Sequence, residues 1–372
     1  MNKKPLKITI YDKYIFNQLL MATFVAILLF VIVWIAPEIL LNTIKLTING
    51  IYTPKEAILV LLLELPKILG KALPVGLLLG TLFTFDKLSK DSELTIFRAI
   101  GLSFKRILVP VLALSLIGTM LCFITYDKLI PIAEQYQNSM SKYQPSIQYI
   151  YTKKDEQSIP QQSIVVSQYN DGNMEKIIVL DFSKQLYQDL HGLSNIYIAK
   201  TGKTKDNYWE LYDITRYNIS REGIYTDIAK IKSMKILEGT DAKNAETLIV
   251  NSAKRDREFT NGELRKYINL LKKESLDEDY RLMLNKYFQR FFHPFVCILL
   301  AVMGALLGFS KPREQRLVGF TIAIACIFVY YITLPFFDLL AEKGVLHPFL
   351  TASIPPIAFL FAILGFYKAK DL

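Results

Sequence analysis

Six long apolar segments constrain the fold of this chain more than any other feature. About 20 apolar residues are enough for a helix to cross the hydrocarbon core of a membrane. The first segment, about 14–36, contains no charged residue, is too long for a signal peptide and has no small-residue cleavage site. The other segments fall at about 53–85, 107–126, 287–309, 317–340 and 348–367. The sequence therefore predicts an α-helical membrane protein with six transmembrane helices.

The positive charge of the chain is placed beside these segments. The net charge is +10 over 372 residues, yet the polar middle of the chain is nearly balanced in sign. Short basic stretches occur at the N-terminus, in 86–106, in 310–316 and at the C-terminus. This distribution follows the positive-inside rule rather than the pattern of a nucleic-acid-binding protein. It predicts that these four regions are cytoplasmic and that the long middle segment lies outside.

The middle segment has the pattern of a β-domain. Short alternating runs occur between about 145 and 252, and turn residues at 170–173, 201–203 and 222–223 separate them; the runs read SIVVSQY, KIIVLDF, NIYIAK, NYWELYDI and TLIV. Such spacing indicates an antiparallel sandwich or an open barrel. We expect three parts: 1–126 with three spans and a cytoplasmic helix at about 90–101, 127–262 as the β-domain, and 263–372 with a linker helix and three spans.

Three capping boxes mark expected helix starts, because a Ser or Thr and a Glu three residues later can satisfy each other's backbone N–H groups. They are Thr53 with Glu56, Thr260 with Glu263 and Ser275 with Glu278. The first begins the second span, with Pro54 at the first helical position, and the last is expected to begin the helix that enters the fourth span.

The motifs of common enzyme sites are missing from the sequence. It has no phosphate-binding GxxxxGK[ST] loop, no spacing typical of a Ser/His/Asp triad and no pair of His ligands one helical turn apart. Its three cysteines lie inside apolar segments and have no metal-ligand spacing. We therefore expect no catalytic residue, metal or cofactor in this chain.

The second segment carries Glu64, Lys67 and Lys71, whose spacing places them on one helix face. Two interpretations remain open. The residues form an internal ion pair, with lysine side chains reaching toward the membrane surface, or the lysines form a basic rim, joined by Lys45, that binds the phosphates of an amphiphile. At the end of the fifth segment, Asp338 is expected to be solvated.

Two GxxxG motifs, 76–80 and 304–308, permit close helix packing, either within the chain or at a subunit interface.

The stretch 91–102 predicts a short amphipathic helix in the basic loop 86–106. Its apolar arc contains Leu94, Ile96, Phe97 and Ile100, and Glu93 falls within that arc. A carboxylate is unfavourable against anionic lipid, whereas a groove on a partner protein with a cation would accommodate it. A partner contact is the favoured interpretation.

These residues, together with two other stretches, carry a resemblance to a known family. The three stretches are Ser92-Glu93-Leu94-Thr95 followed by Gly101-Leu102-Ser103, then Leu65-Pro66-Lys67 with Leu73-Pro74 and Leu79-Gly80, and finally 343–348 through Ile354-Pro355-Pro356. The chain resembles the LptF/LptG (YjgP/YjgQ-like) permeases of the lipopolysaccharide exporter over nearly its whole length. Lys67 is similar to a lipid-facing residue of the LptG-like branch, whereas 92–103 resembles the LptF-like branch more.

The resemblance implies a non-catalytic permease subunit in the inner membrane of a Gram-negative-type bacterium, with cytoplasmic termini and a periplasmic jellyroll-like β-domain. It also implies the partners: a cytoplasmic ABC ATPase dimer, a second LptF/LptG-type permease, a single-span LptC-like subunit and a periplasmic jellyroll bridge protein. Lipopolysaccharide would be extracted from the membrane and passed to the bridge. The helix at about 90–101, which contains most of the 92–103 motif, would be the coupling helix. Its ATPase contact would comprise Glu93, Leu94, Ile96, Phe97 and Ile100.

Two other functions remain as alternatives. A mechanotransmission or lipoprotein-sorting subunit of an ABC transporter usually has four spans, fewer than are expected here. A membrane-anchored β-domain sensor would need no coupling helix and no ATPase.

Overall fold

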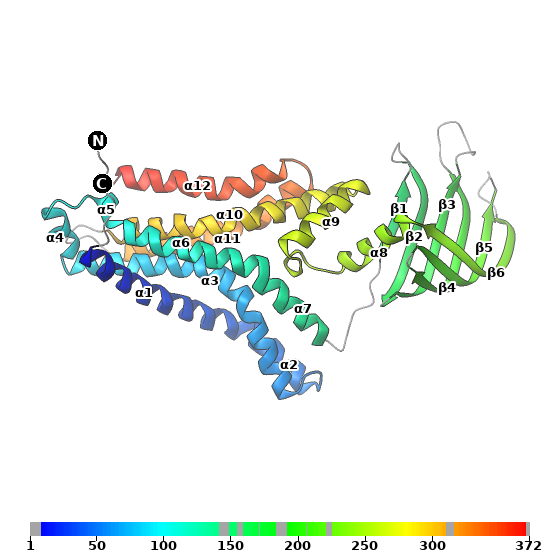
Figure 1. Ribbon diagram of the computed structural model, residues 1–372, viewed down its shortest axis with the longest axis horizontal. Coiled ribbons are helices and arrows are strands. Elements are labelled where there is room, and N and C mark those ends of the chain that lie inside the picture. Colours follow the sequence, from blue (N-terminus) through cyan, green and yellow to red (C-terminus); the bar gives the residue numbers. More distant parts are fainter. Residues whose placement is uncertain are drawn as a thin grey trace. The chain divides into compact units, whose positions relative to one another are not determined.

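The computed structural model describes residues 9–140, 149–154, 159–170, 172–183, 192–205, 207–220, 225–309 and 316–369. The chain divides into two compact units. One unit comprises residues 1–142 and 281–372, and the other comprises residues 143–280. The first is helical, and the second contains an inserted β-sheet (Figure 1).

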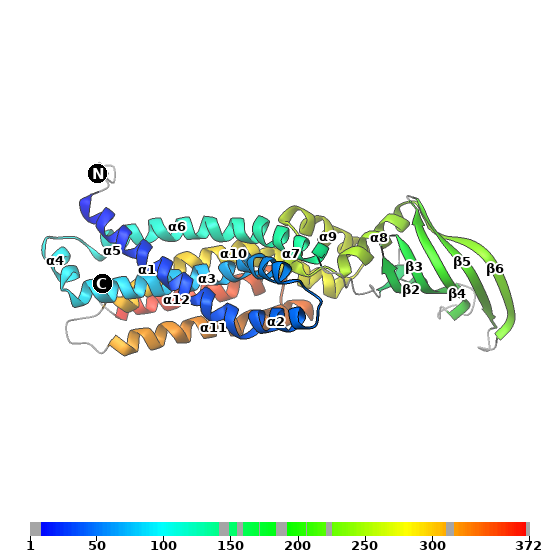
Figure 2. The same cartoon turned by 90° about the horizontal axis from the view of Figure 1, so that it is seen from below.

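Long helices that run alongside one another form the first unit (Figures 1 and 2). Two π-helical segments continue α1 into α2 and α6 into α7. The elements are α1 (Ile10–Trp34), η1 (Ile35–Leu40), α2 (Leu41–Ile48), α3 (Pro54–Lys90), α4 (Glu93–Ala99), α5 (Phe104–Ile107), α6 (Val109–Ile124), η2 (Thr125–Leu129), α7 (Ile130–Met140), α10 (Asp277–Gly308), α11 (Arg316–Glu342) and α12 (Pro348–Ala369).

Within the described residues, five helical segments are long and apolar enough to cross a membrane. They are Ile10–Trp34, Val109–Met140, Asp277–Gly308, Val318–Glu342 and Pro348–Lys368. The expected second span, α3, is not among these five. Its N-terminal half contains Glu64, Lys67 and Lys71, and ionisable residues make a segment less apolar. The α-helical membrane fold is thus confirmed, with five candidate spans in the described part of the chain, and a sixth span through α3 stays a prediction.

Helix α3 lies at the centre of the first unit, and both GxxxG motifs form contacts with it or on it. The motif 76–80 lies on α3 and packs against α1, and the motif 304–308 lies on α10 and packs against α3. A Cβ atom added at Gly80 would overlap the backbone of Thr23 in α1. One added at Gly304 of α10 would overlap Thr81 of α3. The glycines therefore let α1 and α10 approach α3 at backbone distance. Of the two uses left open by the sequence, the structure shows packing within one chain.

Two of the three predicted capping boxes are present. The backbone N–H of Thr53 donates to Glu56 Oε2 at 2.7 Å, and Pro54 is the first residue of α3. Thr260 caps α9 in the same way. The prediction for Ser275 was wrong: its φ of +54° is left-handed, whereas an N-cap residue is extended. Helix α10 begins at Asp277 instead.

A polar network around Asp338 joins α10 to α11 and α12. Asp338 Oδ1 accepts hydrogen bonds from Asn285 at 2.8 Å and Gln289 at 2.7 Å, and Oδ2 is paired with Lys286. The hydroxyl of Thr351 donates to Asn285 Oδ1 at 2.8 Å. The expectation of a solvated Asp338 was therefore wrong, because residues distant in sequence supply three donors to its carboxylate.

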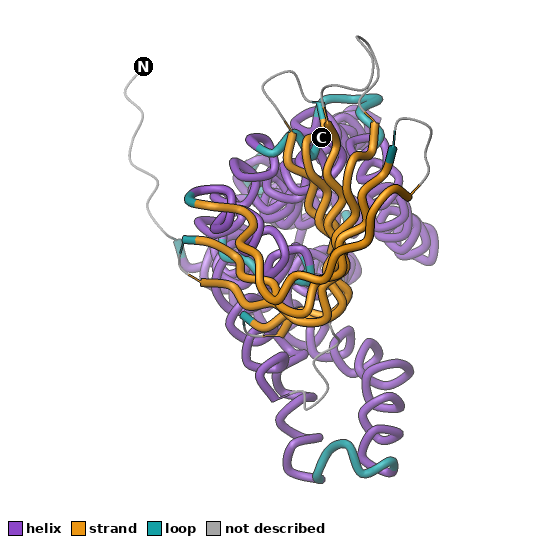
Figure 3. Tube along the Cα trace, turned by 90° about the vertical axis from the view of Figure 1, so that its right-hand side faces the viewer, coloured by secondary structure: helices purple, strands orange, loops and turns teal. Residues whose placement is uncertain are grey.

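The second unit confirms the inserted antiparallel β-domain. Its six strands form one sheet in the order β1-β2-β3-β4-β5-β6, so each strand pairs with the next along the chain. Figure 3 shows that the strands form one curved sheet. Of the two alternatives expected from the sequence, this fits the open barrel better than the sandwich of two packed sheets. The strands are β1 (Tyr149–Lys154), β2 (Pro160–Asn170), β3 (Asn173–Ser183), β4 (Gly192–Lys205), β5 (Tyr208–Ile219) and β6 (Tyr225–Glu238).

Two details of the predicted strands were wrong. Residues 201–203 lie inside β4 rather than in a turn, and TLIV lies in helix α8 (Thr240–Ser252). Leu248 and Ile249 are buried there, so an apolar run of four residues fits a helix as well as a strand. The expected turn at 222–223 lies outside the described residues. Segments η3 (Asp256–Glu258) and α9 (Asn261–Lys273) complete the unit.

Candidate functional site

Two backbone turns, one on each side, separate the short helix α4 from α3 and α5 along the chain. Ser92, between α3 and α4, has a φ of +60°, and Gly101, after α4, has a φ of +89°. Glycine adopts this left-handed conformation without the steric cost of a Cβ atom, so it suits the end of a helix. The two turns fold α4 back at one end of the helical unit, as Figure 1 shows.

Glu93, the first residue of α4, has a partner within the chain. The hydroxyl of Tyr14 in α1 donates to Glu93 Oε1 at 2.9 Å. The two residues are 79 positions apart in the sequence. Glu93 is half-buried, so part of its carboxylate remains accessible. The structure thus places the residue at the contact between α4 and α1.

The apolar residues of α4 divide between the core and the surface. Leu94 is 2% exposed and belongs to the hydrophobic core, and Phe97 is half-buried with its ring 6.1 Å from that of Tyr11. Ile96 is 57% exposed, and Ile100, the C-cap residue directly after α4, is 70% exposed. The surface of α4 that a partner could contact therefore contains Ile96, Ile100 and the accessible part of Glu93.

Beside this contact, Arg106 of α5 binds Asp12 of α1 through two parallel hydrogen bonds. Nη1 donates to Oδ1 at 2.8 Å and Nη2 to Oδ2 at 2.7 Å. The backbone N–H of Thr9 donates to the same carboxylate at 2.8 Å. A bidentate pair fixes both distance and orientation, because two bonds must be kept at once. The start of α1 is thus bound to α5 as well as to α4.

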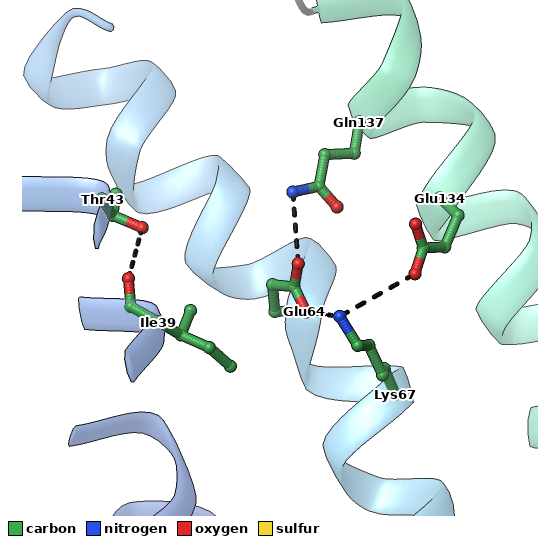
Figure 4. Close-up of polar contacts among 6 residues, drawn as sticks. All are labelled: Ile39, Thr43, Glu64, Lys67, Glu134 and Gln137. Carbon is green, nitrogen blue, oxygen red and sulfur yellow. Dashed lines mark hydrogen bonds and ion pairs between the residues drawn. The ribbon is translucent and has the colours of Figure 1, made fainter. Parts of the chain in front are cut away.

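The lysines predicted to meet lipid phosphates lie on α2 and α3, and Lys67 is held between two carboxylates. Lys67 Nζ lies 2.8 Å from Glu64 Oε2 and 4.0 Å from Glu134 Oε1 of α7 (Figure 4). The side-chain amide of Gln137 donates to Glu64 Oε1 at 3.2 Å. The ion pair expected from the spacing is therefore present, and α7 adds a second acid to it.

The other two lysines have different surroundings. Lys71 is half-buried, and its Nζ lies 4.8 Å from the ring centroid of Trp34, the last residue of α1. A cation over an indole face is attracted by the electron density of the ring. Lys45 is exposed in the last turn of α2. Of the three lysines, Lys45 is the most accessible to a ligand.

Sequence reasoning missed the residues that complete these contacts, which are Tyr14, Asp12, Arg106 and Glu134. Asp12, Tyr14 and Arg106 are polar residues at the ends of apolar segments, where a solvated side chain is the usual expectation. Asp12 offered one signal, since a carboxylate next to an apolar helix requires a cation. Nothing in the spacing indicated which basic residue would supply it.

Within the described residues, no group of three or more His, Cys, Asp or Glu side chains is placed to bind a metal ion. The structure defines a multi-pass membrane protein with an inserted antiparallel β-domain. It also has a short helix, α4, bounded by backbone turns between α3 and α5.

A family profile identifies this class further. The profile described as lipopolysaccharide export system permease LptF/LptG matches residues 13–369, and the chain belongs to that family. Its role is therefore that of a permease component in lipopolysaccharide export. No match was found among curated protein sequences.

Proposed function

We propose that this chain is the permease subunit of an ABC transporter that extracts lipopolysaccharide from the inner membrane and passes it to a periplasmic bridge. The observation that carries the proposal is α4, with its exposed Ile96 and Ile100 and half-buried Glu93. Isoleucines exposed on a short helix are unfavourable in water and suit an apolar groove. Because the chain has no phosphate-binding loop, ATP hydrolysis would occur on a separate ATPase dimer that receives α4.

The same proposal sets the orientation and the other partners. The basic residues near α4 support a cytoplasmic position for α4 and both termini, and the β-domain would then be periplasmic. Helix α1 exposes a broad apolar face, including Met21 and Phe24 at 64% and 60%. Lipid and a second LptF/LptG-type permease would cover such a face. A single-span LptC-like subunit and the bridge protein would complete the path for the lipid.

We also propose Lys45, Lys67 and Lys71 as contacts for the phosphates of the lipid. Lys67 is paired with Glu64, and both side chains are mostly buried at 26% and 13% exposure. A phosphate would therefore compete with a carboxylate for Lys67, whereas it could reach exposed Lys45 directly. In this view Glu64 keeps Lys67 in place until lipid arrives.

The docking proposal is tested by co-purification of the complex in mild detergent and by ATP-driven lipid release from proteoliposomes. We expect the ATPase and a second permease to co-purify with the wild-type chain. Glu93→Ala should lower lipid release while the amount of folded chain in the membrane is unchanged. The matched control is Thr95→Ala, an exposed position on the same helix. Normal release and normal ATPase docking in Glu93→Ala would refute the assignment.

The lysine proposal is tested by photocrosslinking to lipopolysaccharide. Lys67→Glu and Lys71→Glu should weaken crosslinking, and Lys55→Glu, at an exposed position in the first turn of the same helix, should not. Glu64→Gln removes the competing charge and should strengthen crosslinking. Unchanged crosslinking in Lys67→Glu and Lys71→Glu would show that the two lysines have only a structural role.

A further inference from the structure

Three contacts join the first two turns of α1 to the segment that contains α4 and α5. They are Asp12 with Arg106, Tyr14 with Glu93, and Tyr11 with Phe97. We propose that these contacts, called here the α1 tether, pass a displacement of α4 on to α1. The inference rests on the proposed function, in which an ATPase binds α4, and it names the residues that position α1 during transport.

The Asp12–Arg106 pair makes the tether stiff. Asp12 is 8% exposed, and both of its oxygens are bound to the guanidinium group. The same guanidinium lies 4.9 Å from the ring centroid of Tyr11. Rotation of α1 about its axis would break the bidentate geometry, because each oxygen would lose its own N–H donor. Helix α1 and the chain that follows α4 are therefore held in one relative orientation.

The other two contacts attach α4 itself at two points. Glu93 is the first residue of α4, and Phe97 lies one helical turn later on the same side. Glu93 accepts the hydroxyl of Tyr14, and Phe97 packs beside Tyr11. Two attachment points along a short helix oppose tilting as well as translation. Movement of α4 against α1 would thus break both of these contacts, and the Asp12–Arg106 pair holds α1 to the chain that follows α4.

The packing of α1 makes it suited to receive such a movement. Its buried residues form a single stripe, which comprises Asp12, Ile15, Leu19, Thr23 and Ala26. The stripe follows helical spacing, so α1 is held along one line, which faces mainly α3 and also α6. At Gly76 and Gly80 of α3 the contact is close, because Ile27 and Thr23 of α1 occupy the space that a Cβ atom would take. Away from this line α1 is exposed, with Met21 and Phe24 at 64% and 60%, so it is held on fewer faces than α3 or α10, whose buried residues lie on several faces.

The experiment uses the complete transporter in proteoliposomes and measures two quantities, ATP hydrolysis and lipopolysaccharide released per ATP. The variants are Tyr14→Phe, which removes one hydroxyl, and Asp12→Asn, which keeps an acceptor for Thr9 but loses the charge that binds Arg106. Lys13→Gln is the matched control, because Lys13 lies between them and is exposed. The double variant combines Tyr14→Phe with Asp12→Asn. We expect it to hydrolyse ATP but to release at least roughly five-fold less lipid per ATP, since five-fold is the lower end of typical coupling between sites.

Arg106→Lys supplies the graded test. It keeps one cation and loses the bidentate geometry, so its release per ATP should lie between wild type and the double variant. A merely structural role would lower ATP hydrolysis and release together and leave their ratio unchanged. A normal ratio in the double variant, or loss of ATPase co-purification from it, would overturn the tether. Failure of the wild-type chain to retain an ATPase would instead refute the proposed function.

A distance measurement checks the tether without relying on activity. Spin labels at Thr95→Cys on α4 and Lys13→Cys on α1, in a background without the native cysteines, report the separation of the two helices. We expect that separation to stay constant between nucleotide-free and ATP-bound complexes when the tether is intact, and to change in the double variant. A change of equal size in the chain with an intact tether would refute the inference.

Discussion

The network around Asp338 predicts that one carboxylate holds the ends of three helices together. Asp338→Ala removes the acceptor for Asn285, Gln289 and Lys286. Lys286 and Asp338 are 24% and 19% exposed, so the ammonium group can partly rehydrate after the change. Asn285 is 0% exposed and cannot, so its amide N–H would remain buried without an acceptor.

The magnitude follows from these differences in exposure. An unsatisfied buried donor costs about 1–3 kcal/mol, and a hydrogen bond to a charged group contributes about 1.5–3 kcal/mol. Removing one partner of a fully buried ion pair costs about 3–5 kcal/mol. Because the pair here is partly exposed, the lower limit applies, and we expect a loss of about 3 kcal/mol. At roughly 2–4 °C per kcal/mol for a unit of this size, the apparent melting temperature should fall by about 6–12 °C.

The assay is thermal unfolding of the purified chain in detergent at one fixed heating rate, because unfolding of membrane proteins is rarely reversible. Glu342→Ala is the matched control: it removes an acid from the same helix, where the hydrogen bond from Arg281 is to the backbone oxygen. Thr351→Val should cost about 1 kcal/mol. Since Thr351 and Asp338 both bind Asn285, the double variant should be non-additive by about 0.5 kcal/mol or more. Equal melting temperatures for Asp338→Ala and Glu342→Ala would refute the reasoning.

Two further predictions concern packing and pH. Gly80→Ala should destabilise the helical unit by about 1–3 kcal/mol through overlap with Thr23, whereas Gly365→Ala, with open space at its Cβ position, should not; equal melting temperatures would contradict the contact. In the β-domain, burial and the nearby Glu246 raise the pKa of Tyr169 to about 12. A raised pKa means that the neutral phenol stabilises the fold fully below the usual pKa of about 10 and loses this contribution as pH rises toward 12. Tyr169→Phe should show a shallower fall over that interval in alkaline unfolding, and identical curves would contradict it.

Much of the helical fold could be predicted because its signals are local. Segment length gave the helices, and the residues Thr53, Pro54 and Glu56 gave the start of α3 at the correct position. The β-domain was predictable as a class from alternating runs. Its details were not, because the four-residue run 247–250 fits either periodicity and its packing against other elements decides between them.

The candidate site was only half predictable, for a physical reason. The spacing of Glu93, Leu94, Ile96, Phe97 and Ile100 predicted a helix and the residues of its apolar arc. It did not predict how that helix is rotated relative to α1. That rotation buries Leu94 and leaves Ile100 70% exposed. The partners are equally non-local: Arg106 lies 94 residues from Asp12, and Tyr14 lies 79 residues from Glu93. Such pairs form only once the helices have packed.

Helix α3 links the two candidate sites, which are the lysines near its N-terminal end and the helix α4 that follows it. Their positions bear on how one site could influence the other. Helix α3 carries Lys71 in its N-terminal half and leads into α4 at its other end, and most of its buried residues lie between the two. Helix α1 meets both regions, since Tyr14 binds Glu93 and Trp34 lies against Lys71. Tyr14 and Trp34 are about 30 Å apart along one helix at a rise of about 1.5 Å per residue. If the α1 tether passes a movement of α4 on to α1, a shift of α1 against α3 would alter the surroundings of Lys71 without any change in α3 itself.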